Sequence, residues 1–429
     1  MLFKQINILD ENLKLQEDCY VAVRNGKIVS ISAQRPAGEW EREYDGRGKL
    51  LMSGFYNAHA HSPMTLMRGY GENLKLQDWL NKKIFPFEAK LDGNAVYWGT
   101  MLALAESFRF GIVSTSDMYY FCDDMVRAVE ESGAKANISR SITSFAEGSV
   151  KNNDSYREAE ALIRDYHGAA EGRILIDASI HAEYTNTVTS ITEVADLAKK
   201  YGVNMHVHVS ETKQEHEECK ARHGGRTPAQ LLCDLGAFDT RTTAAHCVWA
   251  EEEDIEIFSE KGVTVATCPV SNLKLASGVC NVPALMKKGV NVAVGTDSVA
   301  SNNSLNFIEE MKFFALLNKE RRNDPTLITP KETLRAAARA GALSQGREDC
   351  GVLAVGRKAD LTVLDIGQPH MRPVHNLANN IVYSASGSDV VLTMADGRVL
   401  YRDGDFFTID VEKAAAETER ACRDILRQL

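Results

Sequence analysis

The sequence lacks the cysteine patterns that mark disulfide frameworks and structural zinc modules. Its 429 residues include nine cysteines, an odd number, and no two of them form a CxxC motif. Secreted disulfide-rich domains pair their cysteines, whereas zinc knuckles and cytidine deaminases use CxxC pairs. We therefore expect reduced thiols, no zinc knuckle and a cytoplasmic protein.

Long apolar runs and an excess of positive charge are also absent. No stretch approaches the roughly 18 apolar residues of a membrane span, and acidic residues interrupt the N-terminal segment MLFKQINILDENLKLQED, where a signal peptide needs an apolar core. The net charge is −10, whereas a nucleic-acid partner favours a basic surface. With 44% hydrophobic and 25% charged residues, the composition is that of a globular protein that binds neither membranes nor nucleic acids.

Both ends of the chain are rich in short strand patterns. The tripeptide NGK at 25–27 separates two apolar runs, and DGR at 396–398 separates two more near the other end. Such tripeptides between alternating runs are typical of β-hairpins. Because chain ends often lie close together, we expect residues 1–53 and 356–429 to form one small composite β-sandwich domain, with a helix at the C-terminus.

The middle of the chain, residues 54–355, alternates short apolar runs with helical patterns such as those of 93–111 and 122–133. Alternation of this kind predicts a parallel sheet, and eight such units predict a (β/α)8 TIM barrel. An open doubly wound sheet is the alternative, but no GxGxxG motif follows the first strand. The eight predicted strands cover residues 54–61, 111–118, 135–142, 174–184, 204–212, 242–248, 263–272 and 290–298.

Histidines gather at the ends of these predicted strands. His59 and His61 are two residues apart on one strand, so their side chains point to the same side. In HVHVSET, His206 and His208 both face inward, and His208 lies nearer the mouth of the barrel, where active sites form. With Asp297 at the end of the eighth strand, three histidines and a carboxylate would hold a metal ion that lowers the pKa of a bound water to about 7.

Three other polar residues, His181, Glu211 and His246, also lie at predicted strand ends. A single histidine in such a place is more often a hydrogen-bonded core residue than a ligand. The segment HEECKARH at 216–223 lacks the HExxH spacing of zinc peptidases, and its charges favour a solvated helix. The coincidence of ligand types at four separate strand ends, rather than any single histidine, therefore indicates a metal site.

These residues carry a family resemblance. The sequence resembles the amidohydrolase superfamily, in the branch of 5′-methylthioadenosine/S-adenosylhomocysteine deaminases. Triazine hydrolases share much of the same pattern. The matching stretches run from residue 57 to about 365 and read NAHAHSPMTLMRGYGENLKLQDWL, HVHVSET, AAHCV, CPVSNLKLASG, GTDSVASNN and GRKADLTVLD.

The resemblance implies one divalent metal ion per subunit, held by His59, His61, His208 and Asp297. Zinc is the expected metal, with iron and manganese as alternatives. It also implies that Glu211 shuttles protons to the ring nitrogen and that His246 orients the attacking water and stabilises the tetrahedral centre. Asp297 would accept the proton of the water.

Four further residues are implied to bind substrate. Two-metal members of the superfamily have a lysine at the end of the fourth strand, where this chain has His181, which is expected to contact the purine. Glu88 matches the ribose-binding glutamate, and Trp79 matches the aromatic residue near the base. Arg140 matches one of two arginines that hold the carboxylate of S-adenosylhomocysteine. The second position has at best Lys151, which cannot form the same bidentate fork.

The sequence thus predicts a metal-dependent hydrolytic deaminase of adenosine-type nucleosides: 5′-methylthioadenosine, S-adenosylhomocysteine or adenosine. Such an enzyme releases ammonia and leaves the inosine analogue. The alternative is an amino- or chlorohydrolase of triazines or other heterocycles on the same barrel, and a third hypothesis is a binding or scaffolding barrel without a metal. The expected partner is a small nucleoside, and the resemblance implies a homo-oligomer.

Overall fold

The computed structural model describes all of residues 1–429, and its central part contains two parallel β-sheets. Every strand predicted between residues 54 and 298 is present, and the predicted strand 174–184 is divided in two at Asp177. The first sheet has the order β6 (Phe55–Ala60), β7 (Ile112–Tyr119), β8 (Lys135–Arg140) and β9 (Ile174–Ile176). The second has the order β10 (Ala178–Ala182), β11 (Met205–Val209), β12 (Thr242–His246), β13 (Thr264–Thr267) and β14 (Asn291–Val294).

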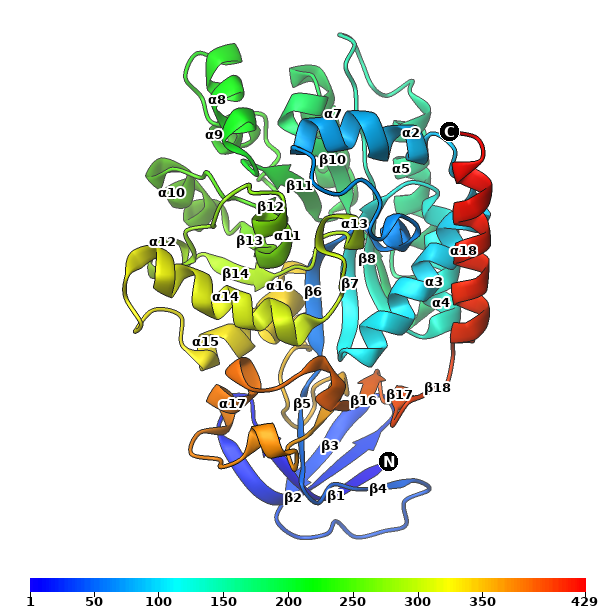
Figure 1. The fold of residues 1–429 in the computed structure, drawn as a ribbon, viewed down its shortest axis with the longest axis vertical. Helices are drawn as coiled ribbons and strands as arrows, with labels where there is room; N and C mark the ends of the chain where they lie inside the picture. The colour runs from blue at the N-terminus through cyan, green and yellow to red at the C-terminus, as the bar shows by residue number, and fades with distance from the viewer.

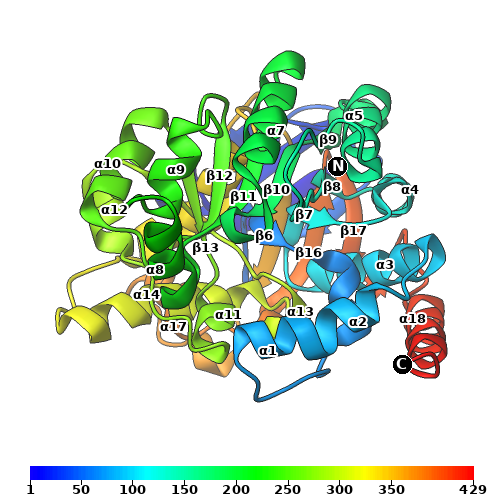
Figure 2. The same ribbon diagram turned by 90° about the horizontal axis from the view of Figure 1, so that it is seen from above.

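The two parallel sheets are linked to each other along both edges. At one edge, Ile142 forms a parallel bridge with Ile180. At the other, the backbone N–H of Asp297 donates to the carbonyl of His59 at 3.0 Å. In the view from above the strands occupy the centre and the helices lie outside them (Figure 2). Strands buried on both faces explain why β6 and β7 have no exposed residue.

The helices between these strands begin and end where the sequence predicts. Helix α3 (Gly93–Arg109) begins after Asp92, whose side chain accepts the N–H of Ala95 at 2.8 Å. Helix α4 (Cys122–Ser132) ends at Gly133, whose φ of 80° suits only glycine well. The other helices that surround the strands are α5 (Asp154–Tyr166), α7 (Val188–Tyr201), α8 (Lys213–Arg222), α9 (Pro228–Asp234), α10 (Glu252–Lys261), α11 (Pro269–Lys274), α12 (Val282–Lys287), α14 (Phe307–Arg322) and α15 (Pro330–Arg335).

Both ends of the chain join one nine-stranded sheet, which lies below the parallel strands (Figure 1). The junction is the antiparallel pairing of β5 with β15, in which Leu51 lies opposite Val363. This sheet encloses its own apolar cluster, separate from the main core. Its strands are β1 (Leu2–Leu9), β2 (Leu15–Arg24), β3 (Lys27–Ser32), β4 (Glu43–Asp45), β5 (Lys49–Ser53), β15 (Leu361–Asp365), β16 (Val390–Ala395), β17 (Arg398–Arg402) and β18 (Asp405–Phe406).

The two predicted hairpins are present, and their turns contact each other. Asn25 and Gly26 have φ of 50° and 72°, and Asp396 and Gly397 have φ of 45° and 76°. Two successive left-handed residues are the requirement of a type I′ turn. A Cβ atom on Gly26 would lie 3.1 Å from the carbonyl oxygen of Asp396, so the close approach also favours glycine. Residues far apart in the sequence therefore pack turn against turn.

The predicted C-terminal helix is present as α18 (Val411–Leu426), but it does not pack on the sheet that precedes it. It lies along α3 (Figure 1), where the hydroxyl of Thr418 donates to the carbonyl of Trp98 at 3.1 Å. None of the helices in the protein combines the length and the hydrophobicity that crossing a membrane requires.

Candidate active site

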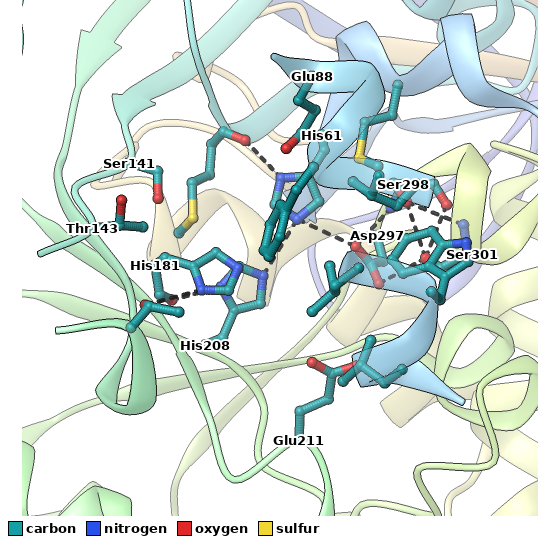
Figure 3. A pocket seen from close by; sticks show the side chains of 18 of the residues that line it. His61, Glu88, Ser141, Thr143, His181, His208, Glu211, Asp297, Ser298 and Ser301 are labelled. Carbon is teal, nitrogen blue, oxygen red and sulfur yellow. Dashed lines mark hydrogen bonds and ion pairs between the residues drawn. The ribbon is translucent and has the colours of Figure 1, made fainter. Parts of the chain in front are cut away.

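The four predicted metal ligands come together above the ends of three strands. His59 and His61 come from the end of β6, His208 from β11, and Asp297 from the loop after β14 (Figure 3 labels the last three). The ligating atoms of the three histidines lie within 4.8 Å of one another. The carboxylate Oδ1 of Asp297 lies 3.4 Å from Nε2 of His61 and 3.7 Å from Nε2 of His59. Nitrogen and oxygen donors from distant parts of the chain thus face one point.

The other ring nitrogen of each histidine is held by a neighbour. Nδ1 of His61 lies 2.6 Å from the carbonyl of Met118, and Nδ1 of His208 lies 2.7 Å from the carbonyl of His181. A carbonyl oxygen can only accept a hydrogen bond, so Nδ1 must be the donor; these contacts therefore place the proton on Nδ1 and leave the lone pair on Nε2. Fixing the tautomer through the second nitrogen is the usual arrangement in histidine metal sites.

The hydrogen bonding of His59 indicates whether the site suits a metal ion. Its Nδ1 lies 2.9 Å from Nε2 of His206, whereas its own Nε2 is buried and has no hydrogen-bond partner. A buried unpaired nitrogen costs free energy unless a ligand satisfies it. Three imidazoles and one carboxylate are a donor set that suits zinc, so the residues present fit a divalent ion. His206 contacts His59 and does not line the cavity above the site, whereas His208 lines it.

Asp297 is held in place by hydroxyl groups. Ser271 and Ser301 donate to its Oδ2 at 2.6 and 3.0 Å, and the backbone N–H of Ser298 donates to Oδ1 at 2.7 Å. These bonds fix the carboxylate plane and turn Oδ1 towards His59 and His61. None of the three serines was singled out in the sequence, although two of them lie in the quoted stretch GTDSVASNN.

Three residues at or after these strand ends have strained backbone conformations. Ser210, His246 and Asp297 have φ of 48°, 70° and 58°, the left-handed region that non-glycine residues rarely adopt. Each follows or ends one of the strands β11, β12 and β14. Strain of this kind costs about 1–3 kcal/mol per residue and persists where the surrounding structure enforces it, most often at functional sites.

A second group of ligand types, His59, His246 and Cys268, also has its atoms within 4.8 Å of one another. Burial raises the pKa of the Cys268 thiol well above its ordinary value. Metal ions bind the thiolate rather than the thiol. The set with Asp297, which is already ionised and turned towards the histidines, is therefore the better site.

Glu211 and His246 lie beside the predicted metal ligands. Nε2 of His246 lies 3.9 Å from Oε2 of Glu211, while Nδ1 of the same ring lies 2.8 Å from the amide oxygen of Asn272. The Asn272 contact keeps a proton on Nδ1 and turns Nε2 towards the cavity. Burial raises the pKa of Glu211, which brings its carboxyl group closer to the range in which it both takes up and releases a proton.

Glu215 is a residue that the sequence analysis missed. Its carboxylate accepts the backbone N–H groups of Ser210 at 3.0 Å and of Glu211 at 2.7 Å, and it lies in the first turn of α8. The spacing Thr212-x-x-Glu215 is a capping box, in which the Thr212 hydroxyl in turn accepts the N–H of Glu215. That pattern was a signal in the sequence from which this role could have been found.

The prediction of a solvated helix at 216–223 is partly wrong. Residues up to Arg222 are helical as part of α8, but His216 is buried, with 2% of its surface exposed. Its ring nitrogens lie 3.1 Å from the Ser210 hydroxyl and 3.1 Å from a carboxylate oxygen of Glu251. Helix α8 packs against the loop that carries Glu211. A segment rich in charged residues therefore contributes one buried polar residue, His216.

A cavity of about 390 Å³ opens over these residues. Three of the predicted substrate-binding residues, Trp79, Glu88 and His181, line it. Trp79 and Glu88 come from α1 (Leu76–Trp79) and α2 (Phe85–Glu88), which the π-helical turn η2 (Leu80–Ile84) joins. The lining also includes His61, Tyr119, Ser141, Thr143, Phe145, Tyr184, His208, Glu211, His246, Asp297 and Ser301.

Two of these groups have shifted pKa values. Burial raises the pKa of Glu88 to about 7, although the neighbouring Tyr119 hydroxyl partly opposes the shift. Burial and nearby histidines lower the pKa of His181 to about 4, so its imidazole is neutral at pH 7. Nδ1 of His181 lies 3.2 Å from the Thr185 hydroxyl.

The two predicted carboxylate-binding residues do not line this cavity. Nε of Arg140 lies 2.6 Å from Glu158 on α5, and its guanidinium packs over the Tyr120 ring at 4.9 Å. Arg140 lines instead an adjoining cavity of about 640 Å³. The Lys151 side chain is 55% exposed and its Nζ lies 4.0 Å from Glu193.

The chain is similar to known proteins over its whole length. The model of the amidohydrolase family matches residues 50–400. This chain belongs to the amidohydrolase family. It is 40% identical to a 5-methylthioadenosine/S-adenosylhomocysteine deaminase of Caldanaerobacter subterraneus, with 100% of this chain and 99% of the relative covered. It is 38% identical to a 5′-deoxyadenosine deaminase of Methanosarcina mazei, over 95% of this chain and 94% of the relative.

Solved structures of this amidohydrolase's relatives show the same fold. An adenosine deaminase from Xanthomonas campestris with bound zinc has a TM-score of 0.94 and 32% identity, over 100% of this chain and 98% of that one. An atrazine chlorohydrolase from Arthrobacter aurescens, complexed with zinc, has a TM-score of 0.90 at 23% identity, over 98% and 99% of the two chains. At that identity the second likeness concerns the fold alone.

Proposed function

We propose that this amidohydrolase is a metal-dependent deaminase of adenosine-type nucleosides. It is a hydrolase of C–N bonds, in which water replaces the 6-amino group, so that ammonia and the inosine analogue are the products. The observation that carries the proposal is that the metal-binding histidines, Glu211 and a cavity with Trp79 and Glu88 on its wall form one continuous site. Full-length relatives named as deaminases of such nucleosides support it.

We also propose how the chain is divided. Residues 54–355 would form one (β/α)8 barrel, since the two parallel sheets are bonded to each other at both edges. Residues 1–53 and 356–429 would form the composite β-sandwich domain with the terminal helix, since both segments contribute strands to one sheet. The proposed active site then lies at the carboxyl ends of the barrel strands, as is usual for this architecture.

His59, His61, His208 and Asp297 would hold one divalent ion. Zinc is the first choice because of the donor set and because of the zinc in the Xanthomonas relative, and iron and manganese are alternatives. When bound, such an ion acts as a Lewis acid that makes water a nucleophile at neutral pH. No lysine lies at the end of β10, where His181 stands, so we propose a site for one ion rather than two.

The protein's own side chains would move the protons. Asp297 accepts a proton from the attacking water, and the Glu211 carboxyl group delivers one to the purine ring nitrogen next to C6. His246 presents Nε2 to the same space, where it orients the water and stabilises the charge that develops on its oxygen. As the C6 carbonyl forms, the hydroxyl at C6 returns a proton to Glu211, and Asp297 passes its proton to the departing amino group, which leaves as ammonia, so both carboxyl groups end in their starting states.

The cavity wall would bind the rest of the nucleoside. Trp79 packs near the base, the neutral His181 contacts the purine, and the Glu88 carboxylate accepts hydrogen bonds from the ribose diol. A buried carboxylate without its diol is left unpaired, so this contact rejects heterocycles that have no sugar. A triazine has no sugar to which Glu88 could bind. The likeness to the atrazine enzyme supports only the shared fold.

The group at the 5′ position of the sugar is proposed to be uncharged. Arg140 is paired with Glu158 and Lys151 is on the surface, so neither side chain lines the cavity proposed to bind the nucleoside. Methylthioadenosine, 5′-deoxyadenosine and adenosine would therefore be preferred to S-adenosylhomocysteine. Arg140 could serve the last of these only after breaking its ion pair.

The proposal is tested by reconstituting the protein with zinc, iron or manganese and assaying ammonia release from a panel of nucleosides and triazines. We expect release from nucleosides and none from triazines. Turnover of triazines alone would support the alternative function, and a protein that binds no metal would support the scaffolding hypothesis. We further propose a cytoplasmic homo-oligomer; the nine free thiols suit a reducing compartment, and light scattering measures the oligomeric state.

A further inference from the structure

Two residues that line the active-site cavity carry buried hydroxyl groups without a hydrogen-bond partner. Tyr119 is 3% exposed and Ser141 is 5% exposed, and both line the cavity. Neither side-chain oxygen makes a hydrogen bond of 3.5 Å or less within the protein, and the Tyr119 hydroxyl lies close enough to the Glu88 carboxylate to interact with it. A buried hydroxyl left unpaired destabilises the protein, so two of them on one cavity wall indicate a ligand that pairs with them. We propose that Tyr119 and Ser141 bind the sugar hydroxyls of the substrate and thereby determine specificity.

The fold places the two residues side by side. Tyr119 is the last residue of β7, and Ser141 follows the last residue of β8, the neighbouring parallel strand. The backbone N–H of Ser141 donates to the carbonyl of Tyr119 at 3.3 Å, which holds both residues at the same height above the strands. Figure 3 shows Ser141 beside Thr143 on the wall that also carries His181. Rigid strand ends, rather than a loop tip, therefore position both hydroxyls.

Their position relative to the other proposed contacts identifies the part of the substrate that they meet. The Tyr119 hydroxyl and the Glu88 carboxylate are close enough to shift each other's pKa. The Tyr119 ring is 6.5 Å from the ring of His61, measured between centroids. Because C6 of the purine must lie at the histidines and the ribose diol at Glu88, Tyr119 stands beside the sugar. This step rests on the proposed function.

The chemistry of the groups is complementary. An ionised carboxylate only accepts hydrogen bonds, so each sugar hydroxyl that donates to Glu88 keeps oxygen lone pairs that need a donor. The phenol of Tyr119 and the hydroxyl of Ser141 are donors on the same wall. Together the three side chains would satisfy both the protons and the lone pairs of a diol, which neither Glu88 nor the hydroxyls achieve alone.

The test combines enzyme variants with substrate variants. Tyr119→Phe and Ser141→Ala each remove one hydroxyl, and 2′-deoxyadenosine and 3′-deoxyadenosine each remove one sugar hydroxyl. For Tyr119→Phe we expect kcat/KM with adenosine to fall about tenfold, mainly through KM, as one net hydrogen bond predicts. When the substrate is the deoxynucleoside that lacks the hydroxyl bound by Tyr119, Tyr119→Phe should leave kcat/KM unchanged. An equal fall for all three substrates, or no fall for any, would overturn the inference.

A matched control exists in the composite sheet. Tyr44 on β4 is also buried with an unpartnered hydroxyl, and it does not line the cavity. Tyr44→Phe should leave all three kcat/KM values unchanged. If Tyr119→Phe does not fold, Ser141→Ala tests the same coupling by itself.

Calorimetry separates this inference from the proposed function. The affinity of the metal-loaded protein for adenosine or inosine should weaken in Tyr119→Phe, and binding is measurable whether or not ammonia is released. A wild-type protein that deaminates nucleosides, with variants that bind them equally well, would refute only the role of the hydroxyls. A wild-type protein that neither deaminates nor binds any nucleoside would refute both.

Discussion

The carboxylate of Glu215 accepts the backbone N–H of Glu211 at 2.7 Å, so the proposed proton carrier is held by a second glutamate four residues along the chain. The same carboxylate accepts the N–H of Ser210, whose φ of 48° turns the chain from β11 into the site. Burial raises the pKa of Glu215 to about 8, although the N–H bonds oppose that shift. Glu215 is therefore a positioning residue. It holds the backbone of Glu211, whose side chain is the proposed proton carrier.

Replacing Glu215 by alanine should lower kcat by roughly 10- to 100-fold, because a displacement of about 1 Å at a reacting group costs that much. The metal content should not change, since Glu215 touches no ligand. Glu215→Gln keeps one acceptor oxygen and should retain more activity than Glu215→Ala. Equal losses in both variants, together with an unchanged KM, would argue against a role for the acceptor oxygens.

Glu211→Gln should abolish proton transfer while the metal stays bound. The amide has nearly the same shape but cannot carry a proton, and a positioned general acid or base contributes about 10²- to 10⁴-fold to a rate. Steady-state assays of ammonia and metal analysis of the same sample check both statements. A variant that loses its metal as well would show that Glu211 helps to hold the ion.

Removing the metal should lower both activity and thermal stability. His208→Ala takes away one ligand, and a ligand that binds only the folded state stabilises it by about 4 kcal/mol at a thousandfold excess over its Kd. We expect a lower melting temperature for His208→Ala and for chelator-treated wild type, with little further effect of chelator on the variant. His167→Ala, in an exposed histidine after α5, is the matched control and should bind metal normally.

Predictions from the sequence agree best with the structure where a feature depends on residues that are neighbours in the chain. A short apolar run predicts β6, and the two-residue repeat of a strand points His59 and His61 to one side of it. The NGK and DGR turns could be predicted because left-handed φ values favour asparagine, aspartate and glycine. The similar strand patterns at the two chain ends predicted that the ends meet, and in the structure β5 pairs with β15.

The sequence gives less information where a partner lies on another element. Arg140 finds Glu158 eighteen residues later, on α5, and no spacing rule relates the two positions. His216 is buried because α8 packs onto the loop of Ser210, whereas the helix on its own looks solvated. In the same way, only tertiary packing decides that α18 lies along α3. Burial and pairing between elements depend on the whole fold, which a local pattern does not encode.

Glu88 should make nucleoside binding depend on pH. Burial raises its pKa to about 7, so the carboxylate is protonated below that pH and ionised above it. Only the ionised form accepts two hydrogen bonds from a ribose diol. KM for adenosine should therefore fall as the pH rises through about 7, and Glu88→Gln should have a higher KM that does not change in this range.

Two results would contradict this role of Glu88. One is a wild-type KM that stays constant between pH 6 and pH 8 (roughly one unit on either side of the pKa). The other is a Glu88→Gln variant that retains the pH dependence. The pH dependence of kcat at saturating adenosine serves as the internal control, because it reports on the ionisation of the bound complex rather than on binding.

Selectivity at the 5′ position follows from the ion pair of Arg140 with Glu158. Because this pair holds the guanidinium outside the cavity, wild-type protein should have a higher kcat/KM for 5′-methylthioadenosine than for S-adenosylhomocysteine. Glu158→Gln removes the negative partner and should narrow that ratio, since Arg140 becomes free to meet the carboxylate of the larger substrate. Glu160→Gln on the same helix, where Glu160 pairs with Lys200, is the control and should leave the ratio unchanged. If wild type handles both substrates equally well, Arg140 must leave Glu158 during binding, and the preference proposed for uncharged 5′ groups is wrong.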